Sequence, residues 1–167
     1  MSVTSEQAEA ADPRREVDRW IGSYSEDHRN PANIVIHWIC VPLIVWTVVA
    51  LLWVIPVPAF LGRPGFWAGM AMVAALAFYL RLSRPLCAGM LVLFVALGLI
   101  TEGLYRVLGP STLLWSAVAV FVAAWIAQFI GHNIEGRRPA FLTDLVYLLI
   151  GPAWIVAKIL RRAGIAY

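Results

Sequence analysis

Four long apolar runs constrain this chain more than any other feature of its sequence, and they cover residues 34–55, 66–80, 86–100 and 112–130. A helix needs about 20 apolar residues to cross a bilayer, so the second and third runs, of about 15 residues each, must extend into their flanks. Only 14% of the residues are charged, against a usual ~25%, and 61% are apolar. We therefore expect an all-α integral membrane bundle with four transmembrane helices.

Proline, glycine and polar residues separate these runs. Asn30 followed by Pro31 predicts an N-cap and a first helical residue, so the first helix should begin at Pro31. Residues 56–64 and 106–111 are rich in Gly and Pro and predict turns, and the segment 81–85 ends the second helix. The second and third runs should therefore form a hairpin.

An amphipathic segment at residues 14–27 precedes the first run. Val17, Trp20, Ile21 and Tyr24 recur at i, i+3, i+4 and i+7, which predicts a short helix lying on the membrane surface. Residues 1–13 are polar and alanine-rich, and we expect them to be disordered. Because no apolar signal-peptide core precedes the first run, that run should act as the insertion signal of a single membrane-embedded catalytic domain over residues 14–167.

A fifth apolar segment, residues 141–160, contains Gly151-Pro152 near its middle. As a full span it would carry Lys158, Arg161 and Arg162 to the opposite side of the membrane from Arg137 and Arg138. A C-terminal re-entrant or broken helix pair that returns to its own side fits this charge pattern better. Crossing by a fifth span remains the alternative.

The basic residues orient the bundle. They gather before the first run, between the second and third runs and near the C-terminus, whereas the other two loops hold only Arg63 and Arg106. The positive-inside rule then places both termini in the cytoplasm of a multi-pass protein, in a bacterial inner membrane or, in a eukaryote, the endoplasmic reticulum. Because the net charge of +3 is small and the basic residues flank apolar runs, a nucleic-acid partner is not expected.

This topology brings the chain's three histidines, His28, His37 and His132, to one membrane face, near the start of the first span and the end of the fourth. Gln128, His132 and Glu135 also share a helix face, being spaced i, i+4 and i+7. Three imidazoles with a nearby carboxylate have the ligand count of a metal centre, and they suit iron or zinc. Glu135 is either a fourth ligand or a group that orients His132.

Several other polar residues surround these histidines in the sequence. Candidate outer partners are Gln128, Asn133 and Asn30, and candidate substrate contacts are Tyr24, Asn33, Arg137 and Arg138. Each has a simpler interpretation as an interfacial residue, and the two arginines also suit membrane anchoring. A guanidinium at the bilayer surface is nevertheless well suited to an anionic lipid head such as a carboxylate. We interpret Cys40 and Cys87 as packing residues because both lie within apolar runs.

Two separated motifs resemble those of the membrane-embedded 2-hydroxy-fatty-acid dioxygenases. The first is Tyr24-xxx-His28-x-Asn30-xx-Asn33-xx-Ile36-His37-xxxx-Pro42, and the second is Trp125-xx-Gln128-Phe129-xx-His132-xx-Glu135-xxx-Pro139-Ala140. The resemblance extends over about residues 20–157. Enzymes of this family take part in phytosphingosine breakdown in fungi and have bacterial relatives.

The resemblance implies an Fe(II)-dependent enzyme that uses O2 to shorten a long-chain 2-hydroxy fatty acid by one carbon through α-oxidation. It implies that His28, His37 and His132 bind Fe(2+), and that the substrate chelates this metal through its carboxylate and 2-hydroxyl groups. Arg137 or Arg138 would steer the carboxylate, while the acyl chain would lie between the apolar helices in contact with membrane lipid.

Three other classes of function are consistent with parts of this pattern. A haem-binding electron carrier needs histidines that face each other across a bundle, often at both membrane faces. A non-catalytic adaptor or transporter would use its histidines to sense pH, to hold a structural metal or to bind a partner. A di-metal desaturase or hydroxylase needs many more histidines than three. A homo-oligomer could add ligands, but nothing in the sequence requires one.

Overall fold

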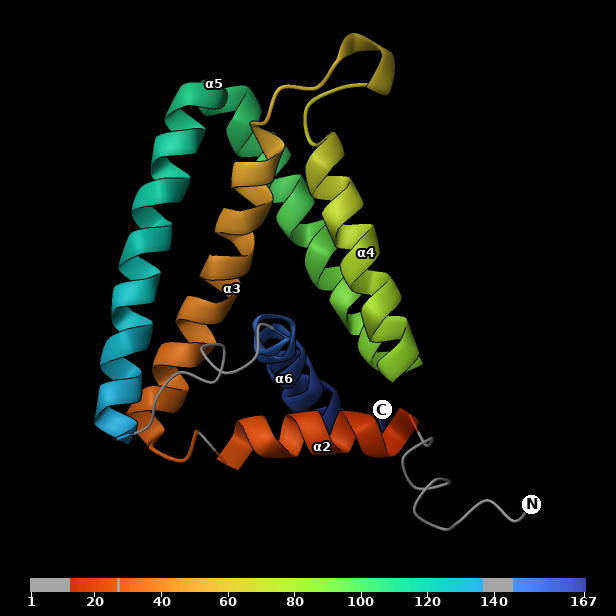
Figure 1. Cartoon of the computed structure of the whole chain (residues 1–167), viewed down its shortest axis with the longest axis vertical. Helices are drawn as coiled ribbons and strands as arrows, with labels where there is room; N and C mark the ends of the chain where they lie inside the picture. The colour runs from red at the N-terminus through yellow and green to blue at the C-terminus, as the bar shows by residue number, and fades with distance from the viewer. Residues whose placement is uncertain (1–12, 27, 137–145) are drawn as a thin grey trace, which may run out of the picture.

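The structure is a computed structural model, and it describes residues 13–26, 28–136 and 146–167. Every regular element in these ranges is helical, which confirms the all-α prediction. Figure 1 shows the helices, and their bounds are α2 Pro13–Glu26, α3 Pro31–Trp53, the short 3-10 helix η1 Ala59–Leu61, α4 Phe66–Leu82, α5 Arg84–Glu135 and α6 Tyr147–Arg162.

The long helix α5 consists of two arms that meet at a sharp bend. Gly109 lies at the bend with φ 78° and ψ 166°, a conformation that residues with a side chain rarely adopt. Pro110 follows, and it cannot continue the hydrogen-bond pattern of the first arm. The predicted turn at residues 106–111 is thus confirmed, and α3, α4 and the two arms of α5 correspond to the four apolar runs.

Side-chain caps fix the starts of the two helices that carry His37 and His132. Asn30 caps α3 because its Oδ1 accepts a hydrogen bond from the Ala32 N–H at 2.9 Å, and Pro31 takes the first helical position. Ser83 caps α5 through a hydrogen bond from the Leu86 N–H at 3.3 Å. The predicted start of the first helix is therefore confirmed.

The helices are arranged like a tent. α3, the second arm of α5, and the pair formed by α4 and the first arm of α5 approach one another at one end and spread apart at the other, where α2 runs across the opening (Figure 1). α6 lies within this open end, and it contributes much of the largest buried cluster, which includes Trp154, Ile150, Tyr79, Leu86 and Met90. The main core of the described chain therefore lies close to α2.

α6 contacts α2 near both of its own ends. Tyr147 shares a hydrogen bond of 3.0 Å with Ser23, and Arg161 lies 3.6 Å from the Asp18 carboxylate. A helix with both ends beside α2 stays at that end of the bundle, as the charge pattern suggested. The expected break at Gly151-Pro152 is wrong, however, because α6 continues through Pro152. Pro152 removes one backbone donor, but the packing around it keeps the helix intact.

The predicted amphipathic helix is present as α2, but its apolar face has a different partner from the one expected. Val17, Ile21 and Tyr24 are buried in the cluster that α6 completes. This face therefore packs on protein, whereas we expected it to face a membrane surface. The pattern i, i+3, i+4, i+7 requires an apolar partner but does not specify whether that partner is lipid or another helix.

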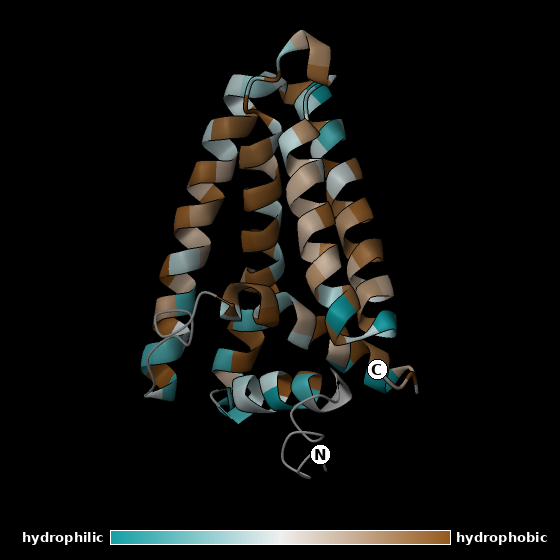
Figure 2. Cartoon of the chain, turned by 45° about the vertical axis from the view of Figure 1, so that its right-hand side comes forward, coloured by the Kyte–Doolittle hydropathy of each residue, from teal (hydrophilic) through white to brown (hydrophobic). Residues whose placement is uncertain are grey.

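Two described helices, α3 and α5, are long and apolar enough to cross a membrane, and α4 is a shorter apolar helix. Figure 2 shows hydrophobic residues along the lengths of these helices and hydrophilic residues mainly near their ends and on α2. Many large apolar side chains point outward. Val92, Leu99 and Val107 are 71%, 70% and 83% exposed. An apolar outer surface of this extent is typical of contact with lipid.

Candidate metal centre

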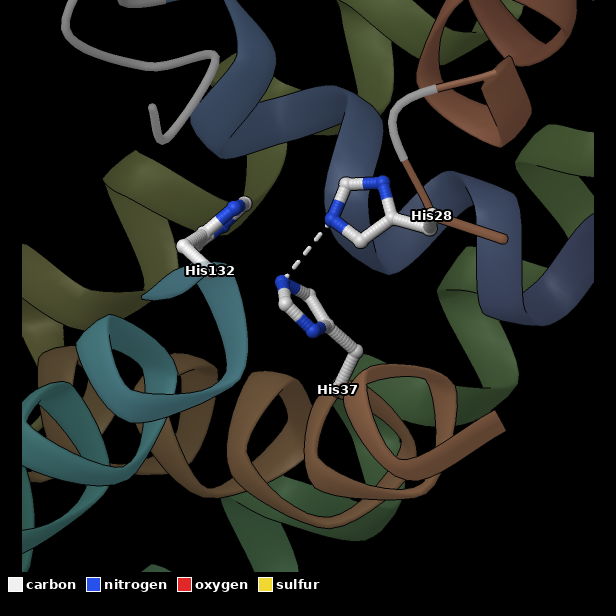
Figure 3. Close-up of side chains that lie close together, drawn as sticks. All are labelled: His28, His37 and His132. Atoms are coloured by element: carbon white, nitrogen blue, oxygen red, sulfur yellow. Dashed lines mark hydrogen bonds between the residues drawn. The ribbon is translucent and has the colours of Figure 1, made fainter. Parts of the chain in front are cut away.

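Three histidines from three different segments meet at the open end of the bundle. His28 lies in the link between α2 and α3, His37 lies two turns into α3, and His132 lies in the last turns of α5. All three are buried, with exposed fractions of 3%, 1% and 5%. Figure 3 shows the three side chains converging on one space, and one nitrogen from each lies within 4.8 Å of the others. The group could hold a metal ion.

Backbone carbonyls orient two of these imidazoles. The Nδ1–H of His28 donates to the carbonyl oxygen of Tyr24 at 2.6 Å, and the Nδ1–H of His37 donates to that of Asn33 at 2.9 Å. A carbonyl oxygen can only accept, so both rings carry their proton on Nδ1 and present an Nε2 lone pair. Metal-binding histidines typically donate such a hydrogen bond from the ring nitrogen that does not bind the metal.

The two Nε2 atoms of His28 and His37 lie 3.0 Å apart and face each other (Figure 3). Two lone pairs at this distance repel each other unless a cation lies between or beside them. At this separation both nitrogens can contact one ion at the ~2.0–2.1 Å distance that is usual for a histidine ligand. The residues present therefore fit a bound metal ion, and the His132 ring, 5.0 Å from the His37 ring centre, supplies a third nitrogen.

Tyr24 fixes His28 from a second direction. Its ring stacks on the His28 ring with 4.2 Å between centroids and 17° between planes. Trp154 of α6 lies beside both rings, with its ring centroid 5.4 Å from that of Tyr24 and 5.8 Å from that of His28, and its indole N–H donates to Ser25 at 2.8 Å. α2 and α6 thus hold the one histidine that does not lie within a long helix.

Glu135 connects the three segments that carry the histidines, but its carboxylate is not part of the group of converging nitrogens. Its Oε1 accepts from the backbone N–H groups of Arg29 and Asn30 at 3.0 and 3.1 Å. Its Oε2 accepts from the Asn30 N–H at 2.9 Å and from the Asn33 side-chain amide at 3.1 Å. Both carboxylate oxygens are therefore engaged by the link after His28 and the first turn of α3.

A glycine allows α3 and α5 to approach closely beside this network. A Cβ atom at Gly131 would collide with the Oδ1 atom of Asn33. Asn33 is fully buried, and its Oδ1 accepts no hydrogen bond from the residues that the structure describes. Any larger residue at position 131 would displace Asn33, whose carbonyl orients His37 and whose amide holds Glu135.

The remaining predicted residues have varied positions. Gln128 is buried and lines the histidine cavity, a space of about 60 Å³ that Tyr24 and all three histidines also line. Asn30 serves as the α3 cap described above. The structure does not bring the Asn133 side chain into this group, because Asn133 is exposed on α5. Arg137 and Arg138 lie outside the described residues.

Several residues that line the cavity were missed by the sequence analysis. They come from α3 and α6, and they are Val41, Ile44, Val45, Tyr147, Leu148, Gly151 and Pro152. The Gly151-Pro152 pair was noticed only as a possible break in the helix. Apolar and aromatic side chains in an apolar run give no signal in the sequence that separates cavity walls from ordinary packing.

Comparison with known proteins identifies the family of this chain. The family model described as 2-hydroxy-palmitic acid dioxygenase Mpo1-like matches residues 15–163. The chain belongs to the Mpo1-like family. A relative from Saccharomyces cerevisiae, 2-hydroxy-palmitic acid dioxygenase MPO1, is 32% identical over 153 residues, which cover 86% of this chain and 79% of the yeast protein. No solved structure matches the chain. The Mpo1-like match includes all three histidines and Glu135, and it confirms the family resemblance given by the two motifs.

Proposed function

We propose that this protein is an Fe(II)-dependent dioxygenase that converts a 2-hydroxy fatty acid to the fatty acid one carbon shorter. The observation that carries the proposal is the pair of facing Nε2 atoms 3.0 Å apart, with a third buried histidine beside them. Membership of the Mpo1-like family and the name of the yeast relative supply the substrate class.

His28, His37 and His132 would hold the ion, and a bound Fe(II) would supply Lewis acidity and the ability to react with O2. The chain's own contribution is to fix the ligands. Tyr24 and Asn33 orient two imidazoles through their carbonyls, and Glu135 keeps the link after His28 against α5. Burial of all three histidines limits the access of water, which protects an oxidisable metal ion and its substrate.

The overall reaction balances with dioxygen alone. A 2-hydroxy acid R–CHOH–COOH and O2 contain the atoms of R–COOH, CO2 and H2O, so the C1–C2 bond can be cleaved without a further reductant. The substrate's carboxylate and 2-hydroxyl groups would face the histidine cavity. Arg137 and Arg138 follow Glu135 by two and three residues, and we propose that one of them pairs with that carboxylate.

We further propose that α3, α4 and the two arms of α5 cross the membrane as four spans, with both termini and the histidines on the cytoplasmic side. The outward apolar side chains of these helices and the distribution of basic residues support this arrangement. A water-insoluble substrate could then reach the site from the bilayer without crossing the aqueous phase.

The test is anaerobic purification followed by elemental analysis and an oxygen-uptake assay with 2-hydroxypalmitate. We expect about one iron per chain, one O2 consumed per acid, and an acid one carbon shorter by mass spectrometry. His132→Ala should lose both the iron and the activity, whereas Asn133→Ala, at the exposed neighbouring position, should retain them. Unchanged iron in His132→Ala would remove His132 from the ligand set, and a Soret band in the purified protein would favour haem binding instead.

A further inference from the structure

A second and larger cavity adjoins the histidine cavity. Its volume is about 370 Å³, and it extends between α3, α4, both arms of α5 and α6. We call this space the apolar chamber. Five residues line both cavities, namely Ile44, Val45, Trp125, Leu148 and Pro152. The apolar chamber therefore lies directly beside the space that the three histidines face.

The walls of the apolar chamber exclude most classes of ligand. They consist of aliphatic and aromatic side chains, with alanines along one face of α4. The hydroxyl group of Tyr79 is committed, because it donates to the Leu149 carbonyl oxygen at 2.8 Å. With no charged side chain in its lining, the chamber offers an anionic or strongly polar ligand no partner, and it suits an unbranched hydrocarbon.

We propose that the apolar chamber binds the alkyl chain of the 2-hydroxy acid, and that three alanines of α4 set the chain length accepted. This inference rests on the proposed function, because the head of the substrate must lie at the histidines. The three alanines are Ala75, Ala71 and Ala68, all of which line the chamber. Their spacing of four and three residues places them in a row on one face of α4.

The row of alanines leads away from the histidines. Tyr79, at the near end of the chamber, contacts α6, whereas Gly65, just before α4, packs against Trp53 at the far end of α3. At 1.5 Å per residue, Ala75 and Ala71 are about 6 Å apart along the axis, and Ala68 is about 16 Å from Tyr79. A larger side chain at each successive position would therefore block the chamber at a greater distance from the histidines.

The test is a graded set of variants in the full chain, Ala75→Leu and Ala71→Leu, with Ala74→Leu as the matched control. Ala74 is exposed on the same helix and lines neither cavity. Each variant is given a mixture of 2-hydroxy acids of 8 to 18 carbons (roughly spanning the chamber and beyond, by the helix rise), and kcat/KM ratios are measured by mass spectrometry. We expect the ratio of kcat/KM for short acids to kcat/KM for long acids to be higher in Ala75→Leu than in Ala71→Leu by about tenfold or more. Ala74→Leu should have the same ratio as the parent.

A binding measurement separates this inference from the proposed function. Metal-free protein in detergent is incubated with the same mixture, repurified, and its retained acids are identified. Graded shortening of the retained acids in the two variants supports the alkyl-chain site even if the parent shows no oxygen uptake, in which case only the proposed function fails. Unchanged chain-length preference in folded Ala75→Leu and Ala71→Leu would overturn the inference while the parent remains active.

A variant on a different helix tests the same site independently, in case the α4 variants misfold. Val48 of α3 lines the same chamber and is 44% exposed, so Val48→Phe narrows the chamber without any change to α4. It should also shift the preference toward shorter acids. If Val48→Phe folds and retains the same acids as the parent, the chamber is not the site of the alkyl chain.

Discussion

The two adjoining cavities are built by different kinds of interaction. The histidine cavity is held by short directional hydrogen bonds to carbonyl and carboxylate oxygens, and it is small, at about 60 Å³. The apolar chamber is held by side-chain packing, and it is about 370 Å³ in volume. Directional contacts fix a few atoms to within tenths of an ångström, whereas apolar packing fixes a volume and a shape.

This difference predicts how each cavity responds to substitution. Removal of a polar group near the histidines should change metal affinity, because the positions of the nitrogens depend on specific donors and acceptors. Changes in the apolar chamber should instead alter stability or substrate length and leave the metal in place. The predictions below follow this division, starting with the largest expected effect.

The largest effect should come from His37→Ala. His37 contributes one of the two facing Nε2 atoms and is held by the Asn33 carbonyl, so its removal leaves His28 without its partner. We expect a loss of metal affinity and of oxygen uptake greater than the ~100-fold that loss of an outer partner causes. Iron per chain after anaerobic purification provides the measurement, and a variant that retains its iron would show that the facing nitrogens do not bind it.

The next effect should come from Glu135→Ala, which removes the acceptor for the N–H groups of Arg29 and Asn30 and for the Asn33 amide. Because Glu135 positions the histidines but is not itself one of the converging metal-binding groups, we expect a ~10–100-fold loss of metal affinity. Competition with a chelator measures this affinity. Glu26→Ala removes an exposed carboxylate and should have no effect.

Glu135→Asp provides a further control, because it keeps the charge but shortens the side chain. If Glu135 acts by position, the aspartate variant should restore only part of the affinity. If Glu135 were a metal ligand, replacement by alanine would instead change the absorption spectrum of the bound metal as well as its affinity. An affinity in Glu135→Ala equal to that of the parent would show that the link after His28 needs no such support.

The sequence predicted the convergence of the histidines because it depended only on topology. Four apolar runs and the positions of the basic residues place the start of the first run and the end of the fourth on one side, whatever the details of packing. The role of Glu135 was left open, between a ligand and an orienting group. Its spacing from His132 shows that both lie on one helix face, but not that backbone N–H groups of a distant segment meet its oxygens.

The arrangement of α6 could not be derived in the same way. Gly151-Pro152 predicts a break when only local backbone preferences are considered, but burial of residues 150–157 keeps the helix continuous. The apolar face of α2 likewise predicts an apolar partner without naming it. Both questions are decided by contacts between α2 and α6, which are far apart in the sequence.

A smaller effect, on stability, should come from Gly131→Ala beside the histidine cavity. The added Cβ would collide with Asn33 Oδ1 and separate α3 from α5, so we expect a loss of about 1–3 kcal/mol. Gly103→Ala is the matched control, because a Cβ there meets nothing within 4 Å, and it should be neutral or stabilising by up to ~1 kcal/mol. Thermal unfolding in detergent distinguishes the two, and equal midpoints would contradict the close approach at Gly131.

The smallest effect should come from Tyr79→Phe in the wall of the apolar chamber. This change removes the hydrogen bond from the Tyr79 hydroxyl to the Leu149 carbonyl oxygen but keeps the buried ring. A typical hydrogen bond contributes about 0.5–1.5 kcal/mol, so the melting temperature should fall by about 1–6 °C. Because Tyr79 does not line the histidine cavity, iron per chain should be unchanged. Loss of iron in this variant would mean that α6 transmits changes in the chamber to the histidines, and the two cavities would then have to be treated as one unit.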